Sequence, residues 1–295
     1  MSWKPIVVGV DASPQAADAA AFAARVAERA ATSWHLVHAA ADGAGAAPAP
    51  GTARSPTAPL DALERAQVVA ALGQRVPAAA LATLTVRPGQ PAAVLGDAVA
   101  AFGAGLVILG GKHHSIMGRW VGGSTGLDVA RSTRVPLFVT VGEPTVRRVL
   151  VAVDLSAAAR PTIAAAERYA QLFGAELRAL SVVEPLQFLP EVPQWDPSAY
   201  YQHWEDTLAQ DVWPLIRTPG VTTTLRHGAA LDGIVLEVAS WRPDLLVVGS
   251  HGKGWAKRLL VGSVTEGLIN VLPTSLLVVP AGGPAVGHQE PGEPA

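Results

Sequence analysis

The sequence contains no cysteine, carries little net charge and has no long hydrophobic run. None of its 295 residues is a cysteine, so disulfide bonds, thiolate nucleophiles and thiolate metal sites are excluded. The formal net charge is −2 and the basic residues are scattered, which argues against a nucleic-acid-binding surface. No apolar run reaches the about 20 residues that a membrane-spanning helix needs, and the first residues show no signal-peptide pattern. We therefore expect a cytoplasmic protein with no nucleic-acid and no membrane partner.

Patterns typical of hydrolases and metalloproteins are also missing. Ser250 and His251 are adjacent, but Ser250 is not set in a Gly-x-Ser-x-Gly elbow, and adjacency in sequence does not provide the geometry of a catalytic triad. His35 and His38 lie on a predicted strand, where they point to opposite faces and cannot easily share one metal ion. We expect no catalytic residue set and no resident metal site.

A glycine-rich segment between a predicted strand and a predicted helix is the most informative feature present. The apolar run Leu245–Val248 predicts a buried strand, and a helix is expected to begin with Ser263 as its cap. The spacing between them is Gly249, two residues, Gly252, nine residues, and then Gly262-Ser263. Glycine lets a backbone approach an anion closely, and the free N–H groups of a helix start point toward it. The segment therefore predicts a phosphate-binding loop.

This spacing resembles the nucleotide-binding motif of the universal stress protein family, in its ATP-binding branch. The resemblance covers nearly the whole chain, to about Pro280. It implies a stress-response regulator or nucleotide sensor that binds ATP, with AMP or ADP as alternatives and Mg²⁺ arriving with the nucleotide. It also implies that the protein is not a high-turnover enzyme. A slow ATPase and a nucleotide-free interaction scaffold are the competing hypotheses.

The resemblance assigns site residues to the second half of the chain. The aspartate that ends the first strand of this half is implied to lie against the adenosine, although such an aspartate also suits a helix cap. The basic residues of the nine-residue insert are either phosphate ligands or a solvated loop. The implied nucleotide-binding residues are Asp154, Gly249, Ser250, Gly252, Lys253, Gly254, Arg258, Gly262, Ser263 and Val264.

The first half of the chain repeats the same pattern with one important change. Gly110 and the pair Gly123-Ser124 match Gly249 and Gly262-Ser263 at one constant offset. The residues of this first site are Gly9, Asp11, Gly110, Gly123 and Ser124. His113 stands where the second half has Gly252, and a non-glycine residue costs about 1–2 kcal/mol if the turn requires a positive φ. We therefore expect the first site to bind nucleotide more weakly or not at all.

The repeat predicts two tandem domains, residues 1–143 and 144–281, followed by a disordered tail at 282–295. Alternating buried strands and helices predict a doubly wound parallel sheet in each domain. The resemblance implies the adenine nucleotide alpha hydrolase-like fold, with the two domains paired about a pseudo-twofold axis; a homodimer is a further alternative.

Three local predictions complete the outline of the fold. We expect the final strands of the two domains, 135–139 and 275–279, to form the contact between the domains. In the second domain we expect a helix over 200–217. The aromatic segment 185–204 before and within it either caps the nucleotide, forms a partner surface or packs on its own sheet.

Overall fold

The computed structural model describes residues 3–40, 58–112, 125–185, 197–251 and 261–281, and the following account concerns these residues. The strands of the first half are β1 Ile6–Gly9, β2 Trp34–Ala40, β3 Thr85–Pro88, β4 Leu106–Gly111 and β5 Leu137–Val141. Those of the second half are β6 Arg148–Ala152, β7 Glu176–Val183, β8 Thr222–His227, β9 Leu245–Gly249 and β10 Ser275–Val279. The helices are α1 Pro14–Ala30, α2 Ala58–Leu72, α3 Ala78–Ala82, α4 Pro91–Phe102, α5 Thr125–Ser132, α6 Ala159–Phe173, α7 Pro197–Thr207, α8 Ala230–Trp241 and α9 Ser263–Val271.

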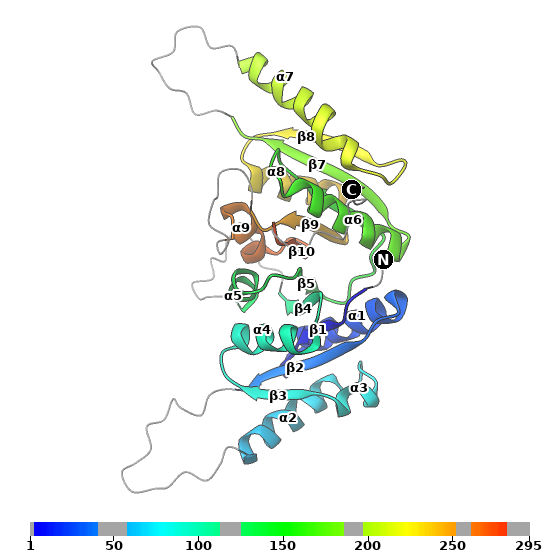
Figure 1. Cartoon of the computed structure of the whole chain (residues 1–295), viewed down its shortest axis with the longest axis vertical. Coiled ribbons are helices and arrows are strands. Elements are labelled where there is room, and N and C mark those ends of the chain that lie inside the picture. Colours follow the sequence, from blue (N-terminus) through cyan, green and yellow to red (C-terminus); the bar gives the residue numbers. More distant parts are fainter. Residues whose placement is uncertain (1–2, 41–57, 113–124, 186–196, 252–260, 282–295) are drawn as a thin grey trace, which may run out of the picture.

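All ten strands belong to one sheet, in the order β3-β2-β1-β4-β5-β10-β9-β6-β7-β8. From each edge of the sheet to its middle, the strands follow in equivalent order, β3-β2-β1-β4-β5 in the first half and β8-β7-β6-β9-β10 in the second. The halves are therefore related by a pseudo-twofold axis between β5 and β10 (Figure 1). Every strand pair within a half is parallel, whereas β5 and β10 are antiparallel, with Phe138 opposite Leu277. The predicted doubly wound domains and their contact through the final strands are confirmed.

The central strands form where they do because both of their faces are buried. In β9, Leu245 and Val247 pack on the side of α1 and α6, whereas Leu246 and Val248 pack on the side of α4, α5, α8 and α9. Successive side chains of a strand point to opposite faces, so an uninterrupted apolar run fills two helical layers at once.

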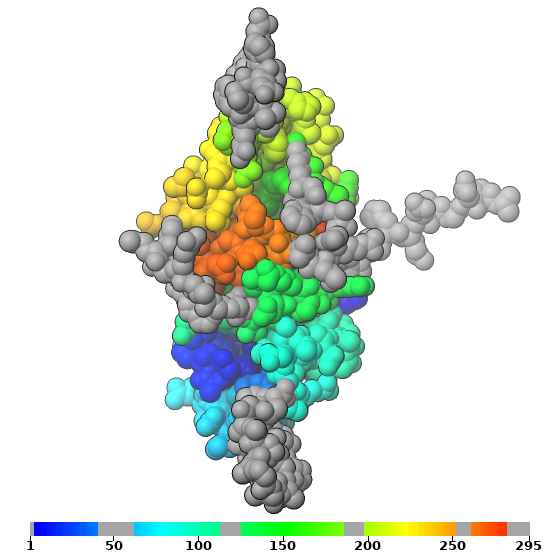
Figure 2. Space-filling view, turned by 90° about the vertical axis from the view of Figure 1, so that its left-hand side faces the viewer, coloured from blue at the N-terminus to red at the C-terminus, as the bar shows by residue number. Residues whose placement is uncertain are grey.

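The junction between the two halves is packed on both sides of the sheet. On one side, Phe138 of β5 lies between Phe22 of α1 and Tyr169 of α6, with ring centroids 4.6 Å and 5.7 Å away. On the other side, Arg131 of α5 donates to Glu266 of α9 at 3.0 Å. Figure 2 shows the orange surface of α9 beside the green surface of α5 at the middle of the molecule. The two halves therefore share a continuous core.

Two elements differ from the sequence-based expectation. The α-helix predicted over 200–217 is wrong beyond Thr207, because α7 gives way to a π-helical turn at Leu208–Val212 and a 3₁₀ turn at Trp213–Leu215. Pro214 has no N–H group to donate and cannot continue an α-helix. The last strand of the first half starts at Leu137, later than expected, because it follows Pro136. The predicted tail at 282–295 lies outside the described residues.

Candidate functional site

The carboxyl ends of β6 and β9 lie side by side at the place where the strand order reverses. These two strands are parallel neighbours, with Ala152 opposite Val248. Asp154 follows β6 and Gly249 ends β9, so the structure brings together the two parts of the predicted second site. In doubly wound sheets, ligands bind beyond the carboxyl ends of strands at such a reversal.

Asp154 organises the turn that leads from β6 into α6. Its Oδ1 accepts hydrogen bonds from the backbone N–H of Ser156 at 3.1 Å and from the Ser156 hydroxyl at 2.5 Å. Asp11 accepts from the N–H of Ser13 at 2.9 Å in the same way, but Asp11 is exposed whereas Asp154 is half-buried. Neither aspartate is itself a helix cap: Ser13 caps α1, and the cap position of α6 makes no side-chain bond. The alternative role of the two aspartates is therefore turn formation.

Two hydrogen bonds hold the two ends of the segment between β9 and α9 together, and a third joins the end of β9 to β10. The N–H of Gly262 donates to the carbonyl of Ser250 at 2.8 Å, and the N–H of Ser250 donates to the carbonyl of Val279 at 2.8 Å. The hydroxyl of Thr265 donates to the carbonyl of Gly249 at 2.7 Å. The amino-terminal end of α9 is thereby fixed beside the end of β9.

The start of α9 is suited to an anion. The cap is Gly262, with φ −65° and ψ 152°, so the expectation that Ser263 caps the helix is wrong; Ser263 is the first helical residue and is exposed. Among the described residues no side chain caps α9, and the first N–H groups of a helix have no partner within it. A helix start contributes about 0.3–1 kcal/mol per nearby charge at exposed sites, and a direct hydrogen bond to a charged group about 1.5–3 kcal/mol.

Ser250 and His251 form a hydrogen-bonded pair next to this helix start. The Ser250 Oγ lies 2.8 Å from the His251 Nδ1 and also accepts from the N–H of Ala281 at 3.2 Å. Burial lowers the pKa of His251 below its usual value of 6.5, which favours the neutral ring. The contact does not make a hydrolase site, because Ser250 is only 4% exposed and the His251 Nε2 has no partner within the described ranges. Sequence reasoning treated His251 only as half of a weak hydrolase pattern; its position between two motif glycines was the one available signal.

In the first half, two glycines of the predicted site, Gly9 and Gly110, are closely packed. A Cβ atom on Gly110 would lie 2.3 Å from the carbonyl oxygen of Gln15, because the end of β4 abuts the start of α1. A Cβ atom on Gly9 would lie 2.5 Å from the Leu109 Cδ2. On Gly249 the nearest atom, the Cβ of Ala158, would be 3.2 Å away. The two strand ends are therefore not equivalent, and the first has less free space above it.

Several predicted site residues fall outside the part of the chain that the structure describes, and their roles stay predictions. They are Gly252, Lys253, Gly254 and Arg258 in the second half, and His113, Gly123 and Ser124 in the first.

The aromatic and histidine residues that raised other possibilities have local roles. Trp204 packs against the core on the α6 side, and the ring of Tyr201 lies 4.6 Å from that of His227. For these residues, packing on their own sheet is the favoured alternative. His35 stacks on Phe102 at 4.0 Å, whereas the Nδ1–H of His38 donates to a backbone carbonyl on the other face at 2.7 Å. Among the described residues no group of three His, Cys, Asp or Glu side chains could hold a metal ion.

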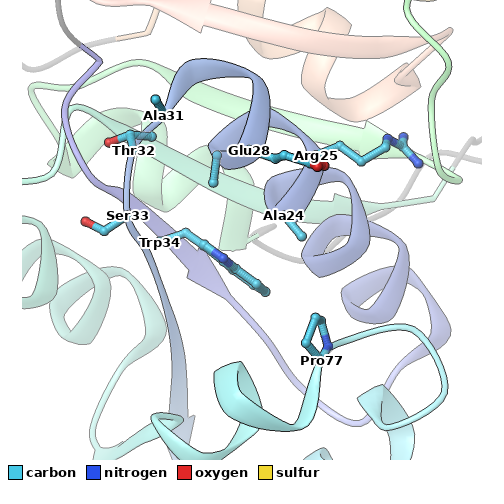
Figure 3. Close-up of a pocket in the computed structure, with 9 residues that line it drawn as sticks. Ala24, Arg25, Glu28, Ala31, Thr32, Ser33, Trp34 and Pro77 are labelled. Atoms are coloured by element: carbon cyan, nitrogen blue, oxygen red, sulfur yellow. The ribbon is translucent and has the colours of Figure 1, made fainter.

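Two hollows of the described surface lie away from the predicted site. One of about 600 Å³ is formed by the carboxyl-terminal end of α1, Trp34 at the start of β2, and Pro77 (Figure 3). Another of about 410 Å³ lies where β8 leads into α8, around Gly228. Neither is lined by Asp154, Gly249 or Ser263. In the described ranges, no helix combines the length and apolar character required to cross a membrane.

Known proteins resemble the chain over both halves. The model of the universal stress protein family matches residues 2–140 and again residues 145–280. A universal stress protein of Mycobacterium tuberculosis is 28% identical over 187 residues, which is 59% of this chain and 61% of the relative's length. A universal stress protein of Archaeoglobus fulgidus, 17% identical, superposes with a TM-score of 0.62 over 94% of this chain and 98% of its own. A protein of Pseudomonas aeruginosa described as a putative universal stress protein, 16% identical, superposes with a TM-score of 0.60 over 94% and 93%. These structures show a shared fold.

Proposed function

The chain belongs to the universal stress protein family, with one family domain in each half, and from this premise we propose that it binds an adenine nucleotide, ATP in the first place, in its second domain. We propose further that the nucleotide makes the protein a regulator or sensor in a cytoplasmic stress response.

The observation that carries the proposal is that Asp154 follows β6 beside its parallel neighbour β9, to whose end the start of α9 is hydrogen-bonded. A carboxylate accepts hydrogen bonds, which suits the ribose hydroxyls, whereas uncapped N–H groups donate, which suits phosphate oxygens. The hydrogen bond from the N–H of Gly262 to the carbonyl of Ser250 holds the start of α9 beside the end of β9. The arrangement thus offers complementary chemistry to the two ends of a nucleotide.

The residues present fit phosphate better than they fit a metal ion. The described part of the site presents N–H donors at α9 and the carboxylate of Asp154, while the carboxylate of Glu266 in the first turn of α9 is paired with Arg131. AMP and ADP remain alternatives to ATP, and any Mg²⁺ would arrive on the nucleotide phosphates. Slow hydrolysis is the less favoured alternative, and Mg²⁺-dependent release of ADP would reveal it.

Calorimetric titration with ATP tests the proposal. We expect one tight site per chain, and acid extraction of the purified protein should release an adenine nucleotide if the site stays loaded. Asp154→Asn should weaken binding about tenfold or more, because a carboxylate acceptor is lost. The matched control is Asp11→Asn, which removes the equivalent turn-forming carboxylate of the first domain and should leave the tight site unchanged.

Each outcome has a distinct meaning. Equal losses in both variants would place the nucleoside contact elsewhere, and two equal sites would contradict the asymmetry of the domains. No binding of any adenine nucleotide would leave the interaction scaffold as the better description.

A further inference from the structure

The sheet has one free edge in each domain. β3 is the edge strand of the first domain and β8 that of the second, and no described strand lies beyond either of them (Figure 1). A free edge presents unpaired N–H and C=O groups to which another strand can add, so natural proteins commonly obstruct it. Because the two domains repeat the same strands, their edges can be compared residue by residue.

Three residues of β8 direct their backbone groups outward. The N–H of Gly228, just after the strand, donates to the carbonyl of Val183 in β7 at 3.0 Å. The backbone groups of successive strand residues point to opposite sides, so Thr223, Leu225 and His227 direct theirs away from β7. Each of these residues has an N–H group, and Thr223 and His227 are exposed. The edge of the second domain therefore offers both donors and acceptors along its length.

The edge of the first domain is obstructed. The N–H of Gly89 donates to the carbonyl of Ala40 at 3.2 Å, so Val86 and Pro88 are the residues of β3 that face outward. Pro88 has no N–H group to donate, and proline on an edge strand hinders the addition of another strand. At the constant offset between the two halves, Pro88 corresponds to His227. The first edge thus lacks a donor at the place where the second edge has one.

The helix beside each edge shows the same contrast. Leu236 of α8 is 59% exposed and lines the hollow of about 410 Å³ at the carboxyl-terminal end of β8. The corresponding residue of α4 is Asp97, which is exposed and charged. A charge beside an edge opposes the addition of another strand, whereas an exposed leucine side chain is stabilised when it is covered. The second domain has neither of the two features that obstruct the first edge.

We propose that β8 is the surface through which two copies of this chain pair, with the two β8 strands antiparallel about a twofold axis at Leu225. This register sets Leu225 opposite its own counterpart, and Thr223 opposite His227 of the second copy. The outward N–H and C=O groups of the two strands then meet in hydrogen-bonded pairs. The sheets of the two molecules become one continuous sheet.

The side chains of β8 also match themselves in this register. Arg226 donates to Glu237 of α8, so Arg226, Thr224 and Thr222 point to the α8 side of the sheet. Thr224 lies opposite Arg226 of the second copy, and no pair sets two charges of the same sign opposite each other, which would destabilise the contact. A twofold axis perpendicular to the sheet keeps the same side continuous across both molecules, so threonines of the second copy approach Leu236 and the hollow. An edge that matches itself in hydrogen bonds, faces and charges indicates a second copy as its occupant.

Sedimentation velocity of the full chain over a range of concentrations tests the inference. The wild type should form a dimer. His227→Pro gives this edge the residue that the first domain has, and should raise the dimer dissociation constant about tenfold or more, because a hydrogen-bond donor is lost at two symmetric places. His227→Ala is the control, because it keeps the N–H group, and should stay within about threefold of the wild type. Thermal unfolding of each variant separates weaker pairing from loss of folding.

The contribution of the flanking helix has its own matched pair of variants. Leu236→Asp gives α8 the charge that α4 carries and should also weaken the dimer about tenfold or more. Leu63→Asp places the same charge on α2 of the first domain, at a leucine that is 57% exposed. This control should leave the dimer unchanged.

Cross-linking tests the register, because the chain has no cysteine of its own. Leu225→Cys should give a disulfide-linked dimer on mild oxidation, since the Cα atoms of a hydrogen-bonded antiparallel pair lie about 5.5 Å apart, within reach of a disulfide. Thr222→Cys should not, because the two copies of that residue would be about 20 Å apart along the paired strands. A cross-link at residue 222 with none at residue 225 would overturn the proposed register.

Two results would overturn the inference as a whole. One is a wild-type chain that stays monomeric at every concentration. The other is a dimer that both His227→Pro and Leu236→Asp leave intact, which would place the contact on another surface. None of these measurements depends on the proposed nucleotide site, which the ATP titration tests separately.

Discussion

The double substitution Gly9→Ala with Leu109→Val should be tolerated in the first domain, because it gives this domain the pair of side chains that the second domain has at the equivalent positions. Gly9 of β1 lies opposite Leu109 of β4, and the equivalent pair in the second domain is Ala152 opposite Val248. Ala152 has one carbon atom more than Gly9, and Val248 has one carbon atom fewer than Leu109. The sum of the two side chains is conserved, which is the condition that packed cores tolerate best.

The single substitutions should each destabilise the first domain. In Gly9→Ala the new Cβ would lie 2.5 Å from the Leu109 Cδ2, and Leu95 Cδ1 at 3.1 Å limits the escape of that side chain. Overpacking of this kind costs about 1–3 kcal/mol. Leu109→Val removes one buried methylene and should cost about 0.5–1.5 kcal/mol. The double variant should return to within about 1 kcal/mol of the wild type, with a coupling energy of about 1–3 kcal/mol.

Urea denaturation of the four proteins measures this cycle through the free energy of unfolding. The reciprocal change, Ala152→Gly with Val248→Leu, is the matched control and should also be tolerated. If the two single costs simply add in the double variant, the side chains do not compete for the same space and the reasoning is refuted.

Three further predictions concern charge and ligand. Burial lowers the pKa of His35, so below about pH 6.5 the unfolded chain takes up the proton first and stability falls; His35→Phe, which keeps the stacking on Phe102, should flatten the pH dependence of the free energy of unfolding. Burial would raise the pKa of Glu237, but hydrogen bonds and charges from Arg178 and Arg226 outweigh this effect and hold the pKa below 4.5. The ionised Glu237 therefore stabilises the folded protein above about pH 4.5, and this contribution is lost as the pH falls through the lower pKa of the folded state. Glu237→Gln should therefore cost about 1–3 kcal/mol at pH 7 in urea denaturation, less than a fully buried pair because the arginines are partly exposed, and no loss would show that the buried carboxylate is dispensable. ATP at about 1,000 times its dissociation constant should stabilise the protein by about 4 kcal/mol in a thermal melt, and an unchanged melt would argue against nucleotide binding.

The sheet was predictable because its central strands are buried along most of their length. Leu245–Val248 and 275–279 are uninterrupted apolar runs, and local pattern suffices to locate them. The antiparallel contact between the last strands followed from the resemblance and from the exposed edge that each domain would otherwise present. The helix over 200–217 failed because Pro214 breaks the hydrogen-bond pattern that its apolar spacing suggests.

The site was predictable in outline but not in its contacts. Asp154 and Gly249 could be paired because they end neighbouring strands of a known topology. The hydrogen bond between Ser250 and His251 could not be foreseen, since it depends on the direction of the chain after β9 and on Ala281. Likewise, the close approach of Gly110 to Gln15 is a tertiary contact that no local pattern reports.

The antiparallel pairing of β5 with β10 joins two domains that already belong to the same polypeptide chain. A tethered domain meets its partner at an effective concentration that the linker sets, which reaches the millimolar range for short connections and does not fall when the protein is diluted. Domain pairing in this chain should accordingly survive dilution that would separate two independent chains. Because each surface has to fit only one fixed partner, the two copies are also free to diverge, as Gly9 with Leu109 and Ala152 with Val248 have done.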